Sequence, residues 1–276
     1  MNDITSYMLE QTKKILSIDS PTGFTAHAAE YVLGAYKKLG YDAKLTNKGG
    51  IFVCVNDGPD QADDPADAPI LLEAHMDTLG GMVCSINEKG RLMLSALGGM
   101  NPNNAEAENC RVYTRSGKVY SGTFQLKNAS IHVNGSYNDT ARSYDTMEVV
   151  LDEPVESKAD TEALGIMTGD IVCFDPRTTV TESGYIKSRF LDDKLSVGIL
   201  LGFAKYLHDE GKKSISISPF LKKSVTAAPL RFLLMSQKFS QSIWAASEMA
   251  FPAKKPRFPS AQRIPAVLII TMLFLL

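Results

Sequence analysis

Hydrophobic positions in the first 81 residues alternate between helical and extended patterns. Residues 7–16 have helical periodicity, and residues 28–38 form a second amphipathic pattern that Thr25 can cap. Residues 40–45 and 50–55 have the composition and length of strands. Helices and strands that alternate in this way predict an α/β domain.

The apolar run Ala68–Leu72 predicts a short buried strand that leads into Glu73-Ala-His75-Met-Asp77-Thr-Leu-Gly80. Residues two apart on an extended chain point to the same side, so Asp77 can reach one ring nitrogen of His75. That contact would fix the tautomer of the ring and leave the other nitrogen free for a metal ion. A structural role is the alternative for a lone histidine.

Between residues 82 and 182 the pattern changes to short alternating runs, separated by turns that contain glycine and asparagine. Such runs predict a small β-rich domain. They occur at residues 91–94, 110–115, 118–124 and 169–174. His132 also lies in this part of the chain, and a structural or surface role is favoured for it.

Two adjacent acids, Asp192 and Asp193, stand before a helical pattern predicted from about Asp193 to Asp209. Acids at the start of a helix can simply cap it and interact favourably with its dipole. Their pairing with the His-x-Asp motif about 115 residues upstream favours a metal site instead.

Three segments together carry a resemblance to a known family. They are Ser20-Pro-Thr-Gly-Phe24, Glu73-Ala-His75-Met-Asp77-Thr-Leu-Gly80 and Phe190-Leu-Asp192-Asp193-Lys194-Leu-Ser-Val-Gly198. In this order and at this spacing, the chain from about Ile4 to Glu210 resembles the glutamyl/tetrahedral aminopeptidases. These are dinuclear metallopeptidases, and some members are labelled endoglucanase or cellulase M. No pair of acids in the sequence is placed as the acid and base of a glycosidase.

The resemblance implies an α/β fold whose catalytic domain is zinc-peptidase-like with a mixed sheet, interrupted by a small β-barrel or PDZ-like domain. The catalytic domain is expected at residues 1–81 and 183–211. The dimerisation-type insertion is expected at residues 82–182. In the family this insertion mediates assembly into larger shells, so a homo-oligomer is expected.

The resemblance also implies site residues and cofactors. His75 would ligate one of two divalent ions, zinc or cobalt, and Asp192 would bridge the two ions. Asp77 would belong to the catalytic group by orienting His75, and Asp193 would have a supporting role. In such sites the ions lower the pKa of bound water to ~7 and polarise the scissile carbonyl, and a carboxylate acts as general base. Peptides that lose N-terminal residues are the implied substrates.

The family further requires a Glu-Glu pair, another metal-binding Asp and a late His. After Glu210 the only acid is Glu248, and no histidine follows His208. As the chain is written, half of the metal site is therefore absent. We expect partial or no metal binding and little or no peptidase activity.

Residues 212–276 differ in charge from the rest of the chain. They carry 10 Lys and Arg against one acid, a balance of +9, whereas residues 1–211 carry 19 against 30, a balance of −11. Codons that encode Ile217–Ala228 can be chosen so that reading them one base out of phase gives Phe-Thr-Val-Ser-Glu-Glu-Val-Gly-His-Gly-Gly. Ser242–Ala250 behaves similarly and gives Val-Asp-Met-Gly-Cys-Val-Gly-Asp-Gly. We therefore hypothesise a one-base slip between about Gly211 and Ile217, which makes residues 212–276 an out-of-frame tail. An ordinary native C-terminus is the alternative.

Composition and local features bound the remaining possibilities. The chain has 276 residues, of which 44% are hydrophobic and 22% are charged, as in ordinary globular proteins. Four scattered cysteines without a CxxC motif favour reduced thiols, and the N-terminus lacks a signal-peptide pattern, so a cytoplasmic location is expected. The apolar segment Ile264–Leu276 has 13 residues, fewer than the ~20 of a membrane-spanning helix.

Three other functions stay open. A non-catalytic assembly module could retain the β-rich insertion. A membrane or nucleic-acid binder could use the basic tail, but its basic residues come mostly as isolated pairs, so we expect no partner of either kind. A zinc carboxypeptidase-like or deacylase relative would have similar metal chemistry, but Asp192-Asp193-Lys194 and the internal β domain disfavour it.

Overall fold

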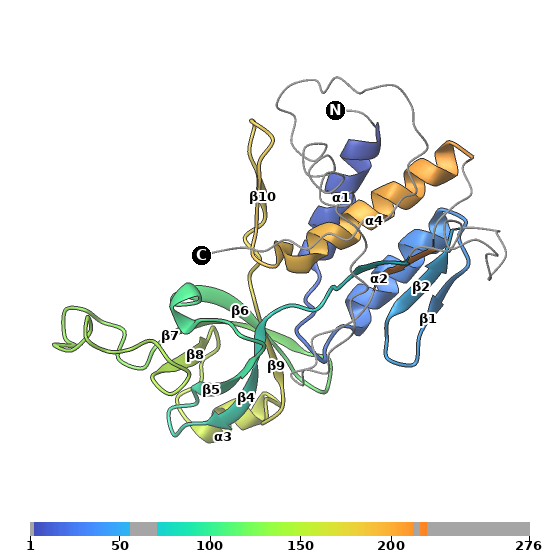
Figure 1. Cartoon of the computed structure of the whole chain (residues 1–276). Helices are drawn as coiled ribbons and strands as arrows, with labels where there is room; N and C mark the ends of the chain where they lie inside the picture. Colours follow the sequence, from blue (N-terminus) through green and yellow to red (C-terminus); the bar gives the residue numbers. More distant parts are fainter. Residues whose placement is uncertain (1–2, 56–70, 212–215, 220–276) are drawn as a thin grey trace. The chain divides into compact units, whose positions relative to one another are not determined.

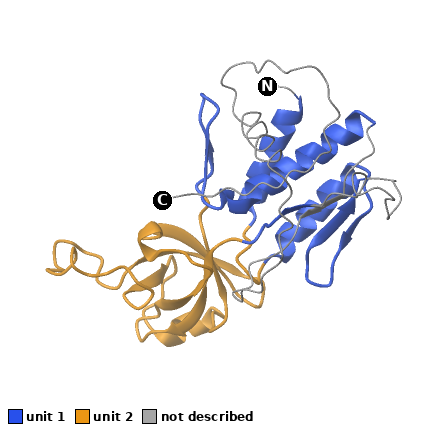
Figure 2. Ribbon diagram, viewed as in Figure 1, with its two compact units in different colours: residues 1–18, 25–77, 177–276 blue, residues 19–24, 78–176 orange. Residues whose placement is uncertain are grey.

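The structure is a computed structural model that describes residues 3–55, 71–211 and 216–219. The chain divides into two compact units (Figure 2). Unit 1 lies within residues 1–18, 25–77 and 177–276, and unit 2 comprises residues 19–24 and 78–176. The chain thus leaves unit 1 just after Asp77 and returns to it at Arg177.

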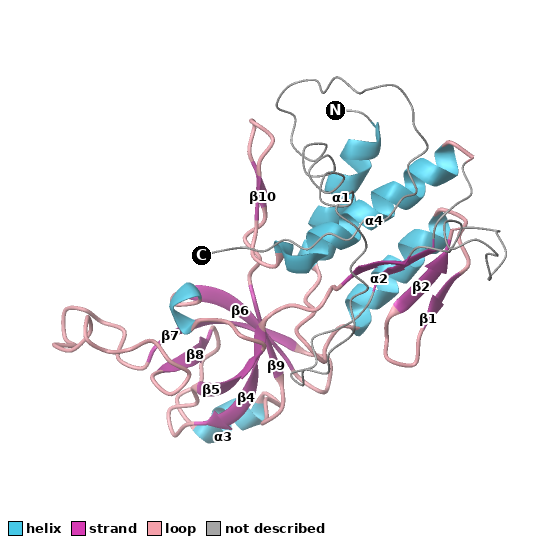
Figure 3. Ribbon diagram, viewed as in Figure 1, coloured by secondary structure: helices cyan, strands magenta, loops and turns pink. Residues whose placement is uncertain are grey.

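Unit 1 contains a mixed four-stranded sheet with the order β1-β2-β12-β3 (Figures 1 and 3). The strands are β1 (Ala43–Leu45), β2 (Ile51–Cys54), β3 (Leu71–Ala74) and β12 (Ser216–Pro219). Strand β12 is antiparallel to β2 and parallel to β3. Backbone pairing within this sheet therefore includes four residues of the segment for which the sequence predicts an out-of-frame tail.

Three helices pack with this sheet around one hydrophobic core: α1 (Asp3–Ser17), α2 (Ala26–Lys38) and α4 (Leu191–Asp209). Strand β2 alternates buried and exposed residues, so Ile51 and Val53 enter the core while Phe52 is 43% exposed. The expected helices at 7–16, 28–38 and 193–209 correspond to these three elements. The predicted cap residue Thr25 occupies the N-cap position of α2 but makes no side-chain capping bond.

The core of unit 1 contains one phenol that is poorly matched to its surroundings. Tyr36 is fully buried, and its hydroxyl has no hydrogen-bond partner among the residues that the structure describes. Burial, together with the neighbouring Tyr7 and Tyr41, raises the pKa of Tyr36 far above its ordinary value. An unpaired buried hydroxyl destabilises the folded state.

We expect Tyr36→Phe to leave the free energy of unfolding unchanged or to raise it by about 1 kcal/mol, because the variant removes this hydroxyl. Tyr41→Phe is the matched control, since the Tyr41 hydroxyl donates to the Ala204 carbonyl oxygen at 2.7 Å. Tyr41→Phe should lower the free energy of unfolding, measured in urea, by about 1 kcal/mol. A larger loss for Tyr36→Phe than for Tyr41→Phe would show that the Tyr36 hydroxyl is paired after all.

Unit 2 is built on a closed six-stranded barrel with the order β4-β5-β8-β7-β6-β9 (Figure 1). Its strands are β4 (Gly80–Ile86), β5 (Leu92–Leu97), β6 (Glu108–Tyr113), β7 (Val119–Leu126), β8 (Met147–Leu151) and β9 (Ile171–Phe174). The barrel contains the buried rings of Phe124 and Phe174, whose centroids are 5.5 Å apart in an edge-to-face arrangement. The predicted β-rich insertion is therefore a closed barrel, which has no open sheet edge.

Short elements complete the two units. In unit 2, the 3-10 helix η2 (Pro102–Asn104) precedes β6, and α3 (Lys158–Ala163) begins with a capping box formed by Ser157 and Asp160. In unit 1, β10 (Thr179–Val180) and β11 (Ile186–Lys187) form a small antiparallel hairpin. No helix in the described part of the chain is long and apolar enough to cross a membrane, and Ile264–Leu276 lies outside the described residues.

The segment 19–24, which carries the Ser-Pro-Thr-Gly-Phe motif, belongs to unit 2. Arg111 on β6 donates to both carboxylate oxygens of Asp19 at 2.6 and 2.8 Å, and it also donates to Asp175. The Tyr113 hydroxyl donates to Asp19 at 2.7 Å. These charge-assisted bonds attach the start of the motif to the barrel wall.

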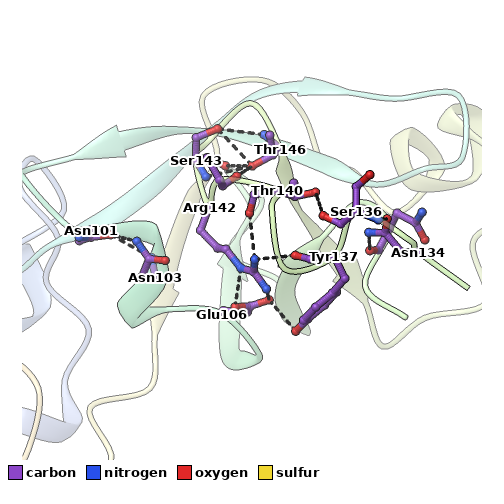
Figure 4. Close-up of polar contacts among 12 residues, drawn as sticks. Asn101, Asn103, Glu106, Asn134, Ser136, Tyr137, Thr140, Arg142, Ser143 and Thr146 are labelled. Atoms are coloured by element: carbon purple, nitrogen blue, oxygen red, sulfur yellow. Dashed lines mark hydrogen bonds and ion pairs between the residues drawn. The ribbon is translucent and has the colours of Figure 1, made fainter. Parts of the chain in front are cut away.

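A long excursion joins β7 to β8, although these two strands pair directly from Leu126 and Met147 onward. Figure 4 shows how Arg142 organises it: the guanidinium donates to both carboxylate oxygens of Glu106 at 2.9 and 3.1 Å. It also donates to the carbonyl oxygens of Tyr137 and Thr140. His132 lies in this excursion and is exposed, in keeping with the surface role expected for it.

Candidate active site

The His-x-Asp motif lies where strand β3 ends, in unit 1. The Nδ1 atom of His75 is 3.0 Å from Oδ1 of Asp77. The Asp77 side chain is 2% exposed and that of His75 is 22% exposed, so the ring stands over a buried carboxylate. A carboxylate at Nδ1 holds the ring orientation and directs Nε2 away from Asp77.

Asp192 faces the other ring nitrogen. Its Oδ1 atom is 3.0 Å from Nε2 of His75, and its side chain is 60% exposed. Just before it, Phe190 has a left-handed backbone with φ of 65°, and the peptide bond between Asp192 and Asp193 is cis. Asp192 and Asp193 both have non-helical backbone angles, so the regular part of α4 begins after them.

Asp193 points to the backbone of the same histidine. Its carboxylate accepts hydrogen bonds from the His75 backbone N–H and from the Ser196 side chain. Burial is the main reason that the pKa of Asp193 rises to about 6, and Asp192 adds to this effect, while the hydrogen bonds and His75 oppose it. The two adjacent acids thus contact one histidine in two ways, through its ring and through its main chain.

The start of α4 is also attached to α1. The Lys194 side chain is 1% exposed, and its ammonium group donates to the Ile18 carbonyl oxygen just after α1. One turn later, Gly198 lies directly against Thr12 of α1, since a Cβ atom built on Gly198 would stand 2.0 Å from Oγ1 of Thr12. The segment Phe190–Asp193, here called the corner, is therefore held by contacts with α1 and with the residues at the end of β3.

The charge around His75 favours a protonated ring. Burial opposes protonation, but the Asp77 carboxylate 3.0 Å from Nδ1 and the negative charges of Asp193 and Asp192 outweigh it, so the pKa of His75 is raised above its ordinary value. In this state His75 and Asp192 form an ion pair. A divalent cation that bound Nε2 would have to replace that proton.

The donor types fit a zinc or cobalt ion, because imidazole nitrogen and carboxylate oxygen are ordinary ligands for both. The two donor atoms, Nε2 of His75 and Oδ1 of Asp192, converge within 3.0 Å, so both can face one cation. A complete site needs more ligands, and no group of three or more His, Cys, Asp or Glu among the described residues could hold a metal ion. The described residues therefore fit part of a metal site.

The structure brings together all four residues that the sequence singles out: His75, Asp77, Asp192 and Asp193. His208 lies near the end of α4, 3.3 Å from Oδ1 of Asp209, and is exposed. Ser196, whose side chain bonds the Asp193 carboxylate, is a further residue at this site that the sequence does not single out, because a serine inside a helical pattern carries no signal of its own.

Comparison with known proteins gives a family and several relatives for this chain. The family model of the M42 glutamyl aminopeptidases matches residues 53–220. The Bacillus subtilis protein YhfE is 42% identical over 193 residues, which are 70% of this chain and 54% of YhfE. The glutamyl aminopeptidase of Lactococcus lactis is 26% identical over 208 residues, which are 74% of this chain and 56% of that protein.

The fold is also found among solved structures. The TET1 peptidase of Pyrococcus horikoshii, which can assemble into a tetrahedron or a large octahedral shell, superposes with a TM-score of 0.64 and 23% identity. That match covers 78% of this chain and 61% of the peptidase. The chain spans about half the length of the curated relatives that it matches. Since the family model covers more than half of the chain, the chain belongs to the M42 glutamyl aminopeptidase family.

Proposed function

We propose that the site serves metal-dependent hydrolysis of N-terminal residues from peptides. The observation that carries this proposal is the His75 ring held between two carboxylates, Asp77 at Nδ1 and Asp192 at Nε2. Membership of an aminopeptidase family supports the same reaction. The peptide substrates and the aminopeptidase activity of the complete protein are part of this proposal.

Each of the four side chains has a separate task in it. Nε2 of His75 and the carboxylate of Asp192 would hold divalent cations, zinc or cobalt, with Asp192 as the bridging group. Asp77 orients the imidazole and fixes its tautomer, and Asp193 supports the corner. When bound, a pair of such ions supplies an acidified water and polarises the scissile carbonyl.

We further propose that this chain, as written, has little or no peptidase activity. Its described residues offer two converging ligand side chains, and the sequence after Glu210 holds a single acid, Glu248, and no histidine. The one-base slip between about Gly211 and Ile217 is our explanation for the missing Glu-Glu pair. On this proposal unit 1 is an incomplete zinc-peptidase-like domain, and the barrel of unit 2 is its PDZ-like insertion.

Two measurements test this part. The first is a nucleotide read across the codons for Lys205–Ala228, where we expect a missing or extra base and a corrected frame that reads Glu-Glu-Val-Gly. The second is release of N-terminal residues from short peptides by the pure chain in the presence of Co²⁺ or Zn²⁺. Robust metal-dependent release by the chain as written would contradict its proposed inactivity.

A second candidate function is a non-catalytic assembly module. The closed barrel of unit 2 favours it, as does the assembly of the Pyrococcus horikoshii peptidase into shells. Size-exclusion chromatography combined with metal analysis separates the two functions. A homo-oligomer without bound metal supports the module, and a metal-loaded species supports the hydrolase.

We also propose a cytoplasmic location for the protein, without nucleic-acid or membrane partners.

A further inference from the structure

Ser196 is a buried hydroxyl in the first regular turn of α4. Ser196 is 4% exposed, and its hydroxyl donates a hydrogen bond to the carboxylate of Asp193. The same carboxylate accepts the backbone N–H of His75, the residue that directly follows strand β3. Three groups from two elements thus form one chain of hydrogen bonds that runs from Ser196 through Asp193 to the main chain of His75.

This chain of bonds differs from an ordinary helix cap. A capping carboxylate accepts N–H groups from the first turn of its own helix. Asp193 instead accepts the Ser196 hydroxyl and the backbone N–H of His75. His75 is far away in sequence and carries the ring that faces Asp192. Burial makes the Asp193 carboxylate costly to keep charged, and a hydroxyl donor offsets part of that cost.

We infer that Ser196 is a positioning residue for the metal site: it holds Asp193 against the His75 backbone, and thereby sets the ring where Nε2 meets Asp192. This inference rests on the proposed function. Loss of the Ser196 hydroxyl should free the Asp193 carboxylate to turn toward solvent, so that the His75 N–H loses its acceptor. Outer contacts of this kind typically change metal affinity by about 10- to 100-fold.

The four histidines of the chain make a direct test possible. The full chain, without a histidine tag, is labelled with ¹⁵N-histidine, which gives four backbone amide signals. In Ser196→Ala we expect the His75 amide signal to move and its hydrogen exchange to accelerate at least about tenfold. The signals of His27, His132 and His208 should stay in place.

Matched variants separate positioning from stability. Ser17→Ala removes an exposed hydroxyl that bonds the Lys14 carbonyl at the end of α1, and it should leave the His75 signal unchanged. Ser196→Thr keeps the hydroxyl and should retain the wild-type His75 exchange rate. If Ser196→Ala does not fold, Ser196→Thr carries the test, and rapid His75 exchange in a folded Ser196→Thr chain would overturn the inference.

Metal binding gives the second readout. Co²⁺ affinity measured by calorimetry should fall about tenfold or more in Ser196→Ala and stay unchanged in Ser17→Ala. An unchanged His75 signal in a folded Ser196→Ala chain would overturn the positioning role. If the wild-type chain binds no Co²⁺, the amide signal alone decides the role of Ser196.

Discussion

Gly198→Ala is expected to lower the free energy of unfolding by about 2 kcal/mol. A methyl group at this position would stand 2.0 Å from Oγ1, 3.0 Å from Cβ and 3.1 Å from Cα of Thr12, so helices α1 and α4 must separate. Overpacking typically costs about 1–3 kcal/mol, and a methyl group this close to both side chain and backbone belongs at the upper end of that range. The better helix propensity of alanine returns only about 1 kcal/mol.

Two other glycine variants are matched controls for this result. A methyl group on Gly202, one turn further along α4, meets the flexible side chain of Met8, which can turn away. We therefore expect a smaller loss for Gly202→Ala. A methyl group on Gly34 in α2 meets nothing within 4 Å, so Gly34→Ala should raise stability by about 0.5–1 kcal/mol.

The order of the three variants is measured by urea unfolding followed by circular dichroism. Equal effects of Gly198→Ala and Gly34→Ala would contradict the close packing of α4 on α1. Because Asp192 and Asp193 directly precede the regular part of α4, a loss of this packing should also loosen the segment that carries both acids.

Arg111→Met should destabilise the chain by about 3 kcal/mol, the second large effect that the structure predicts. Arg111 joins Asp19 and Asp175, and the Asp19 side chain is only 9% exposed, so the variant leaves a nearly buried carboxylate without its cation. Methionine keeps most of the volume of the side chain, which limits the change to charge and hydrogen bonding. The segment 19–24 should become more accessible to proteases.

Arg115→Met is the control for Arg111→Met. Arg115 lies in the same barrel unit but is exposed, and its guanidinium makes only a 3.5 Å contact with the Thr168 carbonyl oxygen. We expect a change within about 0.5 kcal/mol. A similar loss in both arginine variants, measured by thermal unfolding, would mean that the Asp19 network contributes little.

The sequence predicts the elements that have clear periodicity. The amphipathic patterns at 7–16 and 28–38 correspond to α1 and α2. The alternating runs predicted at 91–94, 110–115, 118–124 and 169–174 overlap strands β5, β6, β7 and β9. Strand β4 is missed because Gly80 and Gly81 interrupt its hydrophobic pattern at the start. A methyl group on Gly80 would stand 2.7 Å from Pro21, so these glycines permit close packing rather than a turn.

The candidate site is partly readable from the sequence. Spacing in an extended chain predicts the contact between His75 and Asp77, because it depends on neighbouring residues alone. The approach of Asp192 to His75 follows only from the resemblance, since it joins residues 117 apart and depends on the turn at Phe190. The Ser196 contact needs coordinates, because a helical pattern does not show which hydroxyl faces a buried acid.

The boundaries of the two units are also only partly predictable from the sequence. The sequence predicts that residues 1–81 form one continuous part, yet residues 19–24 group with the barrel of unit 2. The reason is the bond network of Arg111 and Tyr113 to Asp19, together with backbone bonds that pair Ser20 and Thr22 with Thr78. Long-range ion pairs of this kind leave no periodic signal in the sequence.

On the function proposed above, His75 and Asp192 face a common divalent cation. The most direct test is calorimetric titration of the full, untagged chain with Co²⁺, compared with His75→Ala, Asp192→Asn and the control His208→Ala. We expect weak binding by the wild-type chain, a loss of at least about tenfold in His75→Ala and Asp192→Asn, and no change in His208→Ala. Equal Co²⁺ affinity of the wild-type and His75→Ala chains would contradict this role of His75.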